Sequence, residues 1–329
     1  MACILLSNLG ASVTEVVGDA LVAEFSKTQK AGELQSYAFI ALAAGALLGN
    51  LSGGFFLLKT QEPKSMFFTF ALLLTIQLAL SLNTKEISLP SPDLVQRSIS
   101  ENLSKQFSEL VTAINEERIF YPLLWIVAST ALVPLLSGSS FCFQTQCLNL
   151  DPSIIGLSKV MGQLMVLSAT VIYNRYLKRI PMRSLIFGVQ TVYALSFLLD
   201  LCLAKQFNLI LGISNEIYVL CFSALAEAIA QFKILPFTVL FSRLCPSGCE
   251  GSLFAFFASV LCLSSIFSGI FGVGLASFIG VSSGDYSSLP LGIIVQILAA
   301  LVPLGWISCV PNVRNCDVTK KGARRLKGG

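Results

Sequence analysis

Long apolar stretches separated by short polar connections constrain this sequence more than any other feature. They fall near residues 2–26, 33–58, 65–83, 119–142, 153–174, 182–204, 213–242, 250–280 and 288–310. A helix needs about 20 predominantly apolar residues to cross the hydrocarbon core of a bilayer, and these stretches approach or exceed that length. Only 12% of the residues are charged, whereas soluble domains carry about 25%. The sequence therefore predicts an all-α, polytopic membrane bundle with about nine transmembrane helices.

One sizeable polar stretch, residues 84–117, divides three of the predicted spans from the other six. Its second half has apolar residues at helical spacing among charges of both signs, which predicts an amphipathic helix that links two bundles. We expect a partial amino-terminal bundle in residues 1–83, this linker in 84–117, a six-helix bundle in 118–311 and a basic tail in 312–329. Most of the 22 lysines and arginines lie in the tail and in one alternate set of connections. The tail is therefore expected on the cytosolic or equivalent side.

Composition also excludes several classes of function. The chain has no histidine, the commonest metal ligand and the usual acid–base group near neutral pH. Cys245 and Cys249 are the closest cysteine pair and lack a second pair that would complete a zinc site. The short basic tail lacks interleaved aromatic residues. We therefore expect no enzyme, no metal or other cofactor and no nucleic-acid partner.

Two acidic residues interrupt the first apolar stretch. Glu15 and Asp19 are four residues apart, so both carboxyls project from one face of a helix. An acidic side chain near the middle of a membrane costs roughly 2.5–3.5 kcal/mol, so both are expected to face protein or water. Two interpretations stay open. The acids either pair with bases on neighbouring helices, or they line a pathway for a solute or for protons.

The seventh apolar stretch also contains polar groups. Glu227 and Gln231 are four residues apart and share a helical face, whereas Lys233 points elsewhere. Pro236 removes one helical hydrogen bond and can bend the helix there. This pattern fits either a discontinuous transport helix or a structural ion pair. The eighth stretch is rich in glycine and serine, which favours close helix contact.

A basic turn connects the fifth and sixth stretches. It contains Arg175, Lys178, Arg179 and Arg183, and Arg243 ends the seventh stretch. The ordinary interpretation is an anchor on the positive side of the membrane. The alternative is a gating loop whose bases bind the ends of helices as the bundle moves.

Several of these stretches resemble the folate-biopterin transporter family, a branch of the major facilitator superfamily, in a plant-type form. The matching segments are Glu15-Val-Val-Gly-Asp19-Ala-Leu-Val-Ala-Glu24, Gly32-Glu-Leu-Gln-Ser36, Tyr173-Asn-Arg175-Tyr-Leu-Lys178-Arg179-Ile-Pro181, Glu227 through Gln231 and Pro236 to Arg243-Leu-Cys-Pro246, and Glu250-Gly-Ser-Leu-Phe-Ala. They extend over nearly the whole chain in the family's order. The family's acidic-helix motif belongs to its fourth helix, so the chain is expected to lack the first three. Phe25 stands where the family has an arginine.

The resemblance implies a secondary carrier of folates or pterins that couples transport to protons by the rocking of two helix bundles. Glu15, Asp19 or Glu227 would carry the coupling proton, Lys159 or Lys233 would bind a substrate carboxylate, and Gln231 would join the same site. The expected location is the plastid envelope or another plant membrane, in contact with lipids. The alternative is a truncated, non-transporting isoform or fragment with at most a regulatory role.

Overall fold

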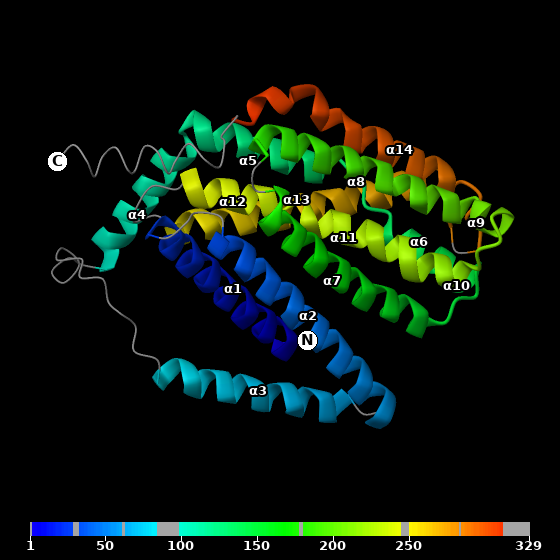
Figure 1. Ribbon diagram of the computed structural model, residues 1–329, viewed down its shortest axis with the longest axis horizontal. Helices are drawn as coiled ribbons and strands as arrows, with labels where there is room; N and C mark the ends of the chain where they lie inside the picture. The colour runs from blue at the N-terminus through cyan, green and yellow to red at the C-terminus, as the bar shows by residue number, and fades with distance from the viewer. Residues whose placement is uncertain are drawn as a thin grey trace.

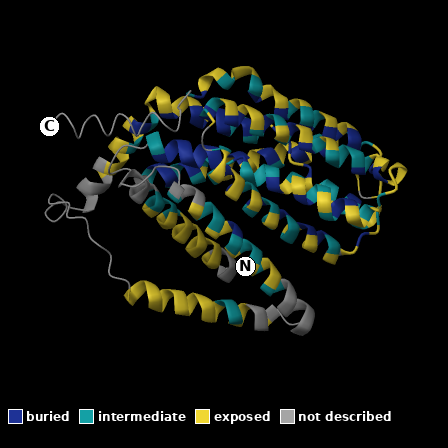
Figure 2. Cartoon of the chain, in the orientation of Figure 1, coloured by how far each residue is buried: buried dark blue, intermediate teal, exposed yellow. Residues whose placement is uncertain are grey.

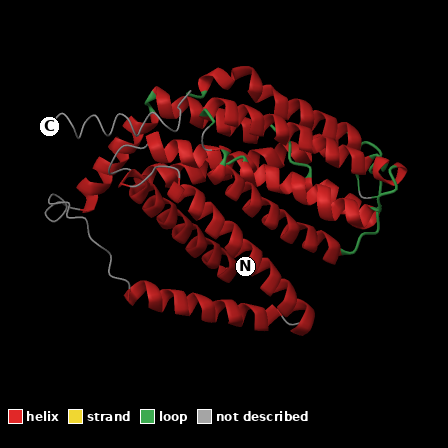
Figure 3. Ribbon diagram, in the orientation of Figure 1, coloured by secondary structure: helices red, strands yellow, loops and turns green. Residues whose placement is uncertain are grey.

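The computed structural model describes residues 2–28, 33–60, 63–83, 99–177, 180–244, 250–282 and 284–311. Within these ranges the regular structure is helical, apart from an isolated bridge between Ser282 and Asp285 (Figure 3). Among the described residues, five helical segments are long and apolar enough to cross a membrane, and two shorter apolar helices accompany them. The chain is therefore a polytopic membrane bundle of helices, as its composition predicts.

Each predicted span falls on a helix or on a series of helices. Figure 1 labels these helices in chain order. Their bounds are α1 (Ala2–Thr28), α2 (Glu33–Thr60), α3 (Pro63–Asn83), α4 (Ile99–Ile114), α5 (Glu117–Ala131), α6 (Ser137–Gln146), α7 (Pro152–Arg175), α8 (Met182–Ala204), α9 (Phe207–Ile210), α10 (Asn215–Tyr218), the π-helix η2 (Val219–Ser223), α11 (Ala224–Phe232), α12 (Leu235–Leu244), α13 (Glu250–Phe278), α14 (Leu289–Leu301) and the 3₁₀-helix η3 (Val302–Cys309). The predicted amphipathic helix is α4, and the part of the linker before it lies outside the described residues.

The fourth predicted span forms two helices, α5 and α6, because the chain leaves helical geometry around Pro134. Other helices bond the backbone groups that this break exposes. The Ser268 hydroxyl on α13 donates to the Val133 carbonyl, and Gln296 Nε2 on α14 donates to the Pro134 carbonyl at 2.7 Å. The Leu135 amide donates to the Ser268 carbonyl at 2.9 Å. Since these groups have partners inside the protein, the break is stable at membrane depth.

The seventh predicted span is interrupted twice. The π-helix η2 joins α10 to α11, and a turn at Lys233 and Ile234 separates α11 from α12. Pro236 occupies the first turn of α12, where a missing amide proton costs nothing. The interruption that the sequence predicts near Pro236 is confirmed. The π-helix was not predicted.

The main core lies where α5, α8, α12 and α13 meet, and Figure 2 shows its buried residues in dark blue. The rings of Trp125 and Phe237 stack with centroids 5.4 Å apart. Trp125 Nε1 donates to the Pro303 carbonyl at 2.9 Å, which joins α5 to η3. Gln190 Nε2 donates to the Ala300 carbonyl at 2.7 Å and joins α8 to α14. These bonds satisfy buried polar groups while apolar packing holds the helices together.

The first three helices lie on one side of this core, and α1 and α2 pack against the bundle. α2 lies along α7, α1 lies along α13 and α2, and α3 contacts α2 (Figure 1). The side chains of α3 that the structure describes are mostly exposed, including Phe68 and Leu82. Large apolar side chains on the surface of such a helix suit contact with lipid.

Candidate functional site

A polar cavity of about 270 Å³ lies between α6, α7, α8, α11 and α14, next to the break between α5 and α6. Polar cavities are unusual inside a membrane bundle, where ionisable groups face protein or water. The polar side chains of its wall are Ser137, Ser140, Gln144, Ser158, Lys159, Tyr193, Ser196, Asp200, Ser223, Glu227 and Gln296.

Three of these side chains are ionisable: Lys159 on α7, Asp200 on α8 and Glu227 on α11. Among the residues that the structure describes, none of the three forms an ion pair within 4 Å. Glu227 Oε1 accepts a hydrogen bond from Gln231 Nε2 at 3.3 Å. Gln163 Nε2 then donates to Gln231 Oε1 at 3.2 Å, so α7 and α11 are joined beside the cavity. The hydrogen bonds from Gln163 to Gln231 and from Gln231 to Glu227 orient the Glu227 carboxyl, but they supply no cation to pair with it.

The π-helix η2 supplies an unusual member of the wall. Its last residue, Ser223, has a buried hydroxyl with no hydrogen-bond partner in the described structure. Nearly all buried hydroxyls in proteins are hydrogen-bonded, and π-helices occur frequently at functional sites. The Ser223 hydroxyl is therefore available to a bound molecule.

Aromatic rings complete one side of the cavity. Tyr193 and Phe197, both on α8, are in edge-to-face contact with centroids 5.0 Å apart, and Phe141 of α6 also lines the wall. Aromatic faces bind flat heterocycles by stacking. The wall therefore combines acidic, basic and aromatic groups within one small space.

Lys233 lies behind this wall. Its Nζ donates to the Ser129 carbonyl at 2.9 Å and lies 4.6 Å from the centroid of the Tyr193 ring. The side chain is buried and does not line the cavity. Lys233 therefore contacts the cavity wall through Tyr193 and not directly.

The acids of the first helix lie elsewhere. Glu15 is exposed and Asp19 is half-buried on α1, which packs on α13 and α2. Neither residue lines the polar cavity. The structure thus brings Lys159, Glu227 and Gln231 together and leaves the two α1 acids separate from them.

The bases of the predicted gating loop have different surroundings. Arg183 binds the end of η3, because its Nε donates to the Val310 carbonyl at 2.8 Å and a terminal nitrogen donates to the Ser308 carbonyl at 2.8 Å. Arg175 is exposed, with its guanidinium 5.9 Å from the centroid of the Tyr176 ring. Arg243 is half-buried at the end of α12. Lys178 and Arg179 lie outside the described residues, as do Cys245 and Cys249.

Two acids outside the predicted spans cap local structure. The carboxylate of Asp151 accepts a hydrogen bond from the Ser153 amide at 2.8 Å at the start of α7, and hydrogen bonds from Ser153 lower its pKa. Asp285 accepts from the Ser287 amide at 3.1 Å, and hydrogen bonds from the side chain and then the backbone of Ser287 lower the pKa of Asp285. A carboxylate that accepts backbone N–H bonds is favoured in its charged form.

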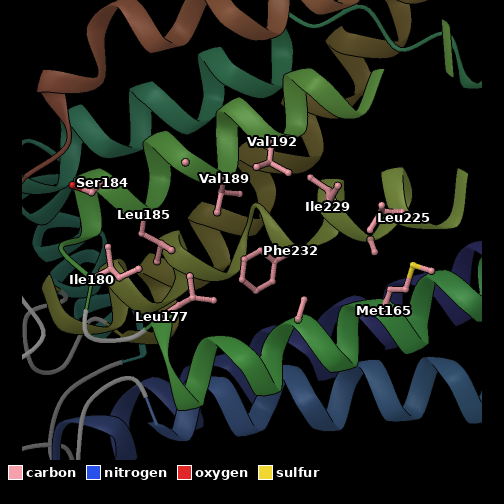
Figure 4. A pocket seen from close by; sticks show the side chains of 13 residues that line it. Met165, Leu177, Ile180, Ser184, Leu185, Val189, Val192, Leu225, Ile229 and Phe232 are labelled. Atoms are coloured by element: carbon pink, nitrogen blue, oxygen red, sulfur yellow. The ribbon is translucent and has the colours of Figure 1, made fainter. Parts of the chain in front are cut away.

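A second hollow, of about 350 Å³, lies between α7, α8 and α11 (Figure 4). Val189 and Val192 of α8, Ile229 and Phe232 of α11 and Met165 of α7 point into it. Ser184 supplies the hydroxyl of its lining, and the other side chains there are apolar. This hollow cannot satisfy the polar edges of a charged or heterocyclic solute, so the polar cavity is the stronger candidate site.

Sequence reasoning missed most members of the polar cavity, among them Tyr193, Asp200 and Ser223. Asp200 has the same signal as Glu227, an acid within an apolar stretch, but it lies near the end of its span and was overlooked. The role of Ser223 depends on the π-helix, and apolar periodicity gives no signal for one. Among the described residues, no group of three or more cysteines, aspartates and glutamates is placed to hold a metal ion.

The fold and this cavity define a polytopic α-helical membrane protein with a charged, aromatic chamber. The sequence matches the BT1 family over residues 1–327, and the chain belongs to that family. It is 57% identical to a protein of Arabidopsis thaliana named probable folate-biopterin transporter 8, chloroplastic, over 99% of this chain and 60% of the relative. It is also 57% identical to probable folate-biopterin transporter 9, chloroplastic, of the same plant, over 94% of this chain and 59% of the relative.

More distant relatives extend this similarity. The folate transporter 2 of Plasmodium falciparum is 29% identical over 95% of this chain and 67% of its own length. The chain spans about three fifths of the two Arabidopsis relatives. No solved structure matches it.

Proposed function

We propose that this chain carries folates or pterins across a membrane and binds them in the polar cavity. The observation that carries this proposal is the placement of Lys159, Asp200 and Glu227, none of which forms an ion pair in the described part of the chain, with aromatic rings around one chamber. Lys159 and Glu227 are exposed and Asp200 is half-buried in the same wall. Ionisable groups within membrane segments almost always face protein or a water-filled cavity and mark solute pathways, so a bound solute would account for their placement. The names of the relatives support the same solutes, and they name transporters rather than enzymes.

Each part of the wall suits one part of such a solute. Tyr193 and Phe197 supply ring faces for the flat pterin. Lys159 supplies a cation for the carboxylates of a folate tail. Lys233, although the sequence suggests it as a second cation, is buried behind Tyr193 and serves to position that ring.

Transport is proposed to couple to protons and to proceed by rocking of the two helix bundles at residues 1–83 and 118–311. Glu227 is the proposed proton carrier in the cavity, and Asp19 and Glu15 are the proposed carriers on α1. Breaks in α5–α6 and α10–α12 give the bundle places to bend. Arg183, which already binds the carbonyl end of η3, is the proposed gate residue together with Arg175, Lys178, Arg179 and Arg243.

The proposed location is the plastid envelope, because the two Arabidopsis relatives are named chloroplastic. The lipids of that membrane would surround the exposed apolar faces of α3 and its neighbours. A non-transporting regulatory role is the weaker alternative, since it leaves the unpaired charges of the cavity without a purpose.

The test is uptake of radiolabelled folic acid by proteoliposomes that contain the full 329-residue chain. An inward proton gradient should accelerate uptake in the wild type. Glu227→Gln should abolish that acceleration, whereas Glu216→Gln, which changes an exposed acid of α10, should leave it intact. No uptake by the wild type would contradict the transport proposal, and an unchanged gradient effect in Glu227→Gln would contradict its coupling role.

A further inference from the structure

The two acids of the polar cavity differ in how they are held. Glu227 already accepts a hydrogen bond from Gln231 at 3.3 Å. Asp200 has no hydrogen-bond partner among the described residues, although it lines the same wall. A carboxylate removed from water needs donors to replace the lost hydration. Asp200 is thus the acid of the cavity that most needs a donor from a ligand.

We propose that Asp200 is the specificity-determining residue of the cavity and reads the 2-amino-4-oxo edge of a pterin ring. This inference rests on the proposed function. The pterin edge presents two parallel donors, the N3–H and one hydrogen of the 2-amino group. Their spacing matches the two oxygens of one carboxylate, so they form the paired hydrogen bonds that give planar recognition its strength.

The neighbouring groups fit the remaining parts of the same edge. The second hydrogen of the 2-amino group can bond to Glu227, whose orientation is fixed by the amide of Gln231. The buried, unpartnered hydroxyl of Ser223 can donate to or accept from a ring atom. The rings of Tyr193 and Phe197 can then stack on the faces of the pterin ring.

The size of the cavity supports a pterin rather than a complete folate. Its volume of about 270 Å³ lies just below the usual range for drug-sized ligands, roughly 300–1,000 Å³. A two-ring heterocycle fits such a space, whereas a folate would extend its aminobenzoyl-glutamate tail beyond the cavity. Lys159, which is exposed on α7 at the wall, is placed for that tail.

The experiment compares two ligands that differ at one position. Pterin carries the 2-amino group, and lumazine, its 2,4-dioxo analogue, carries a carbonyl oxygen there. Binding of each to the full chain in lipid nanodiscs is measured by the intrinsic fluorescence of the ligand. The wild type should bind pterin at least about tenfold more tightly, because a site built for an N–H donor rejects an analogue without it.

Asp200→Asn should weaken pterin binding about tenfold or more and bring the ratio of the two affinities close to one. Glu216→Gln is the matched control and should leave the ratio unchanged. The ligand comparison on the wild type needs no variant, so poor folding of Asp200→Asn does not remove the test. Equal binding of pterin and lumazine by the wild type would overturn the role of Asp200 and leave the transport proposal standing. Failure to bind pterin, lumazine or folic acid would overturn both.

Discussion

Gly272 on α13 allows the break between α5 and α6 to form, and replacing it tests that arrangement. A methyl group at this position would overlap the carbonyl group of Leu135 and lie 2.8 Å from the Leu135 amide nitrogen. Its neighbours are backbone atoms, which cannot swing aside as a flexible side chain can. The Leu135 amide is itself bonded to the Ser268 carbonyl at 2.9 Å. Gly272→Ala must therefore push the two segments apart.

The expected cost combines three effects of known size. Forcing an extra methyl group into a packed site costs about 1–3 kcal/mol, and a contact with fixed backbone belongs at the upper end. Loss of the Leu135–Ser268 hydrogen bond adds about 1 kcal/mol. The higher helix propensity of alanine returns up to about 1 kcal/mol. The net result is a free energy of unfolding lowered by about 3 kcal/mol.

Gly274 on the same helix provides the matched control, since nothing lies within 4 Å of a methyl group added there. Both variants are purified in detergent, and thermal unfolding is followed by the fluorescence of the two tryptophans, of which Trp125 is buried in the core. Gly274→Ala should match or exceed the wild type, whereas Gly272→Ala should unfold at a clearly lower temperature. Equal midpoints for the two variants would refute the reasoning.

Three further predictions concern single side chains. Lys233→Met should raise the free energy of unfolding by about 1 kcal/mol in thermal melts, because a buried ammonium with one carbonyl acceptor retains a desolvation cost that methionine lacks. The same variant should slow uptake. A large loss of stability in Lys233→Met would contradict this prediction. Lys159→Gln should reduce uptake of folic acid and spare that of biopterin, which has no carboxylate tail, and equal effects on the two in an uptake assay would rule out its role. Asp151→Ala should lower the melting temperature at neutral pH. The pKa of Asp151 is lower in the folded than in the unfolded chain, so its carboxylate contributes to stability above the unfolded-state pKa. That contribution is lost as the pH falls through the folded-state pKa. The deficit relative to wild type should therefore vanish in acid, and a deficit that persists there would contradict the capping role.

The helices and their limits could be predicted largely from the sequence because membrane length and apolar content determine them locally. The interruption near Pro236 could also be predicted, since a proline favours the end of one helix before it and fits the first turn of the next. The break at Pro134 shows the limit of such reasoning. Its stability depends on Ser268 and Gln296, which lie more than a hundred residues away in the chain and reach it only after folding.

Dependence on contacts between distant parts of the chain also limits what the sequence predicts about the glycines and about the polar cavity. The glycine-rich eighth span predicts close contact, but only the folded structure shows that a methyl group collides at Gly272 and not at Gly269 or Gly274. Glu227, Gln231 and Lys159 were predicted from their position in apolar stretches, and the structure places Lys159 and Glu227 at one cavity. Asp200 lines the same cavity from another helix. The local sequence pattern does not predict which acids from different helices will line one cavity.

The central claim is that the substrate binds in the polar cavity, and protection of an introduced cysteine measures this most directly. Ser140→Cys, in a chain whose ten native cysteines are replaced, places a thiol in the cavity wall, and Ser259→Cys places one on the exposed face of α13. Alkylation of each thiol by a maleimide is timed with and without saturating folic acid. Folic acid should slow the labelling of Ser140→Cys and leave that of Ser259→Cys unchanged. Labelling of Ser140→Cys at an unaltered rate, in a preparation that still takes up folic acid, would show that the substrate binds elsewhere.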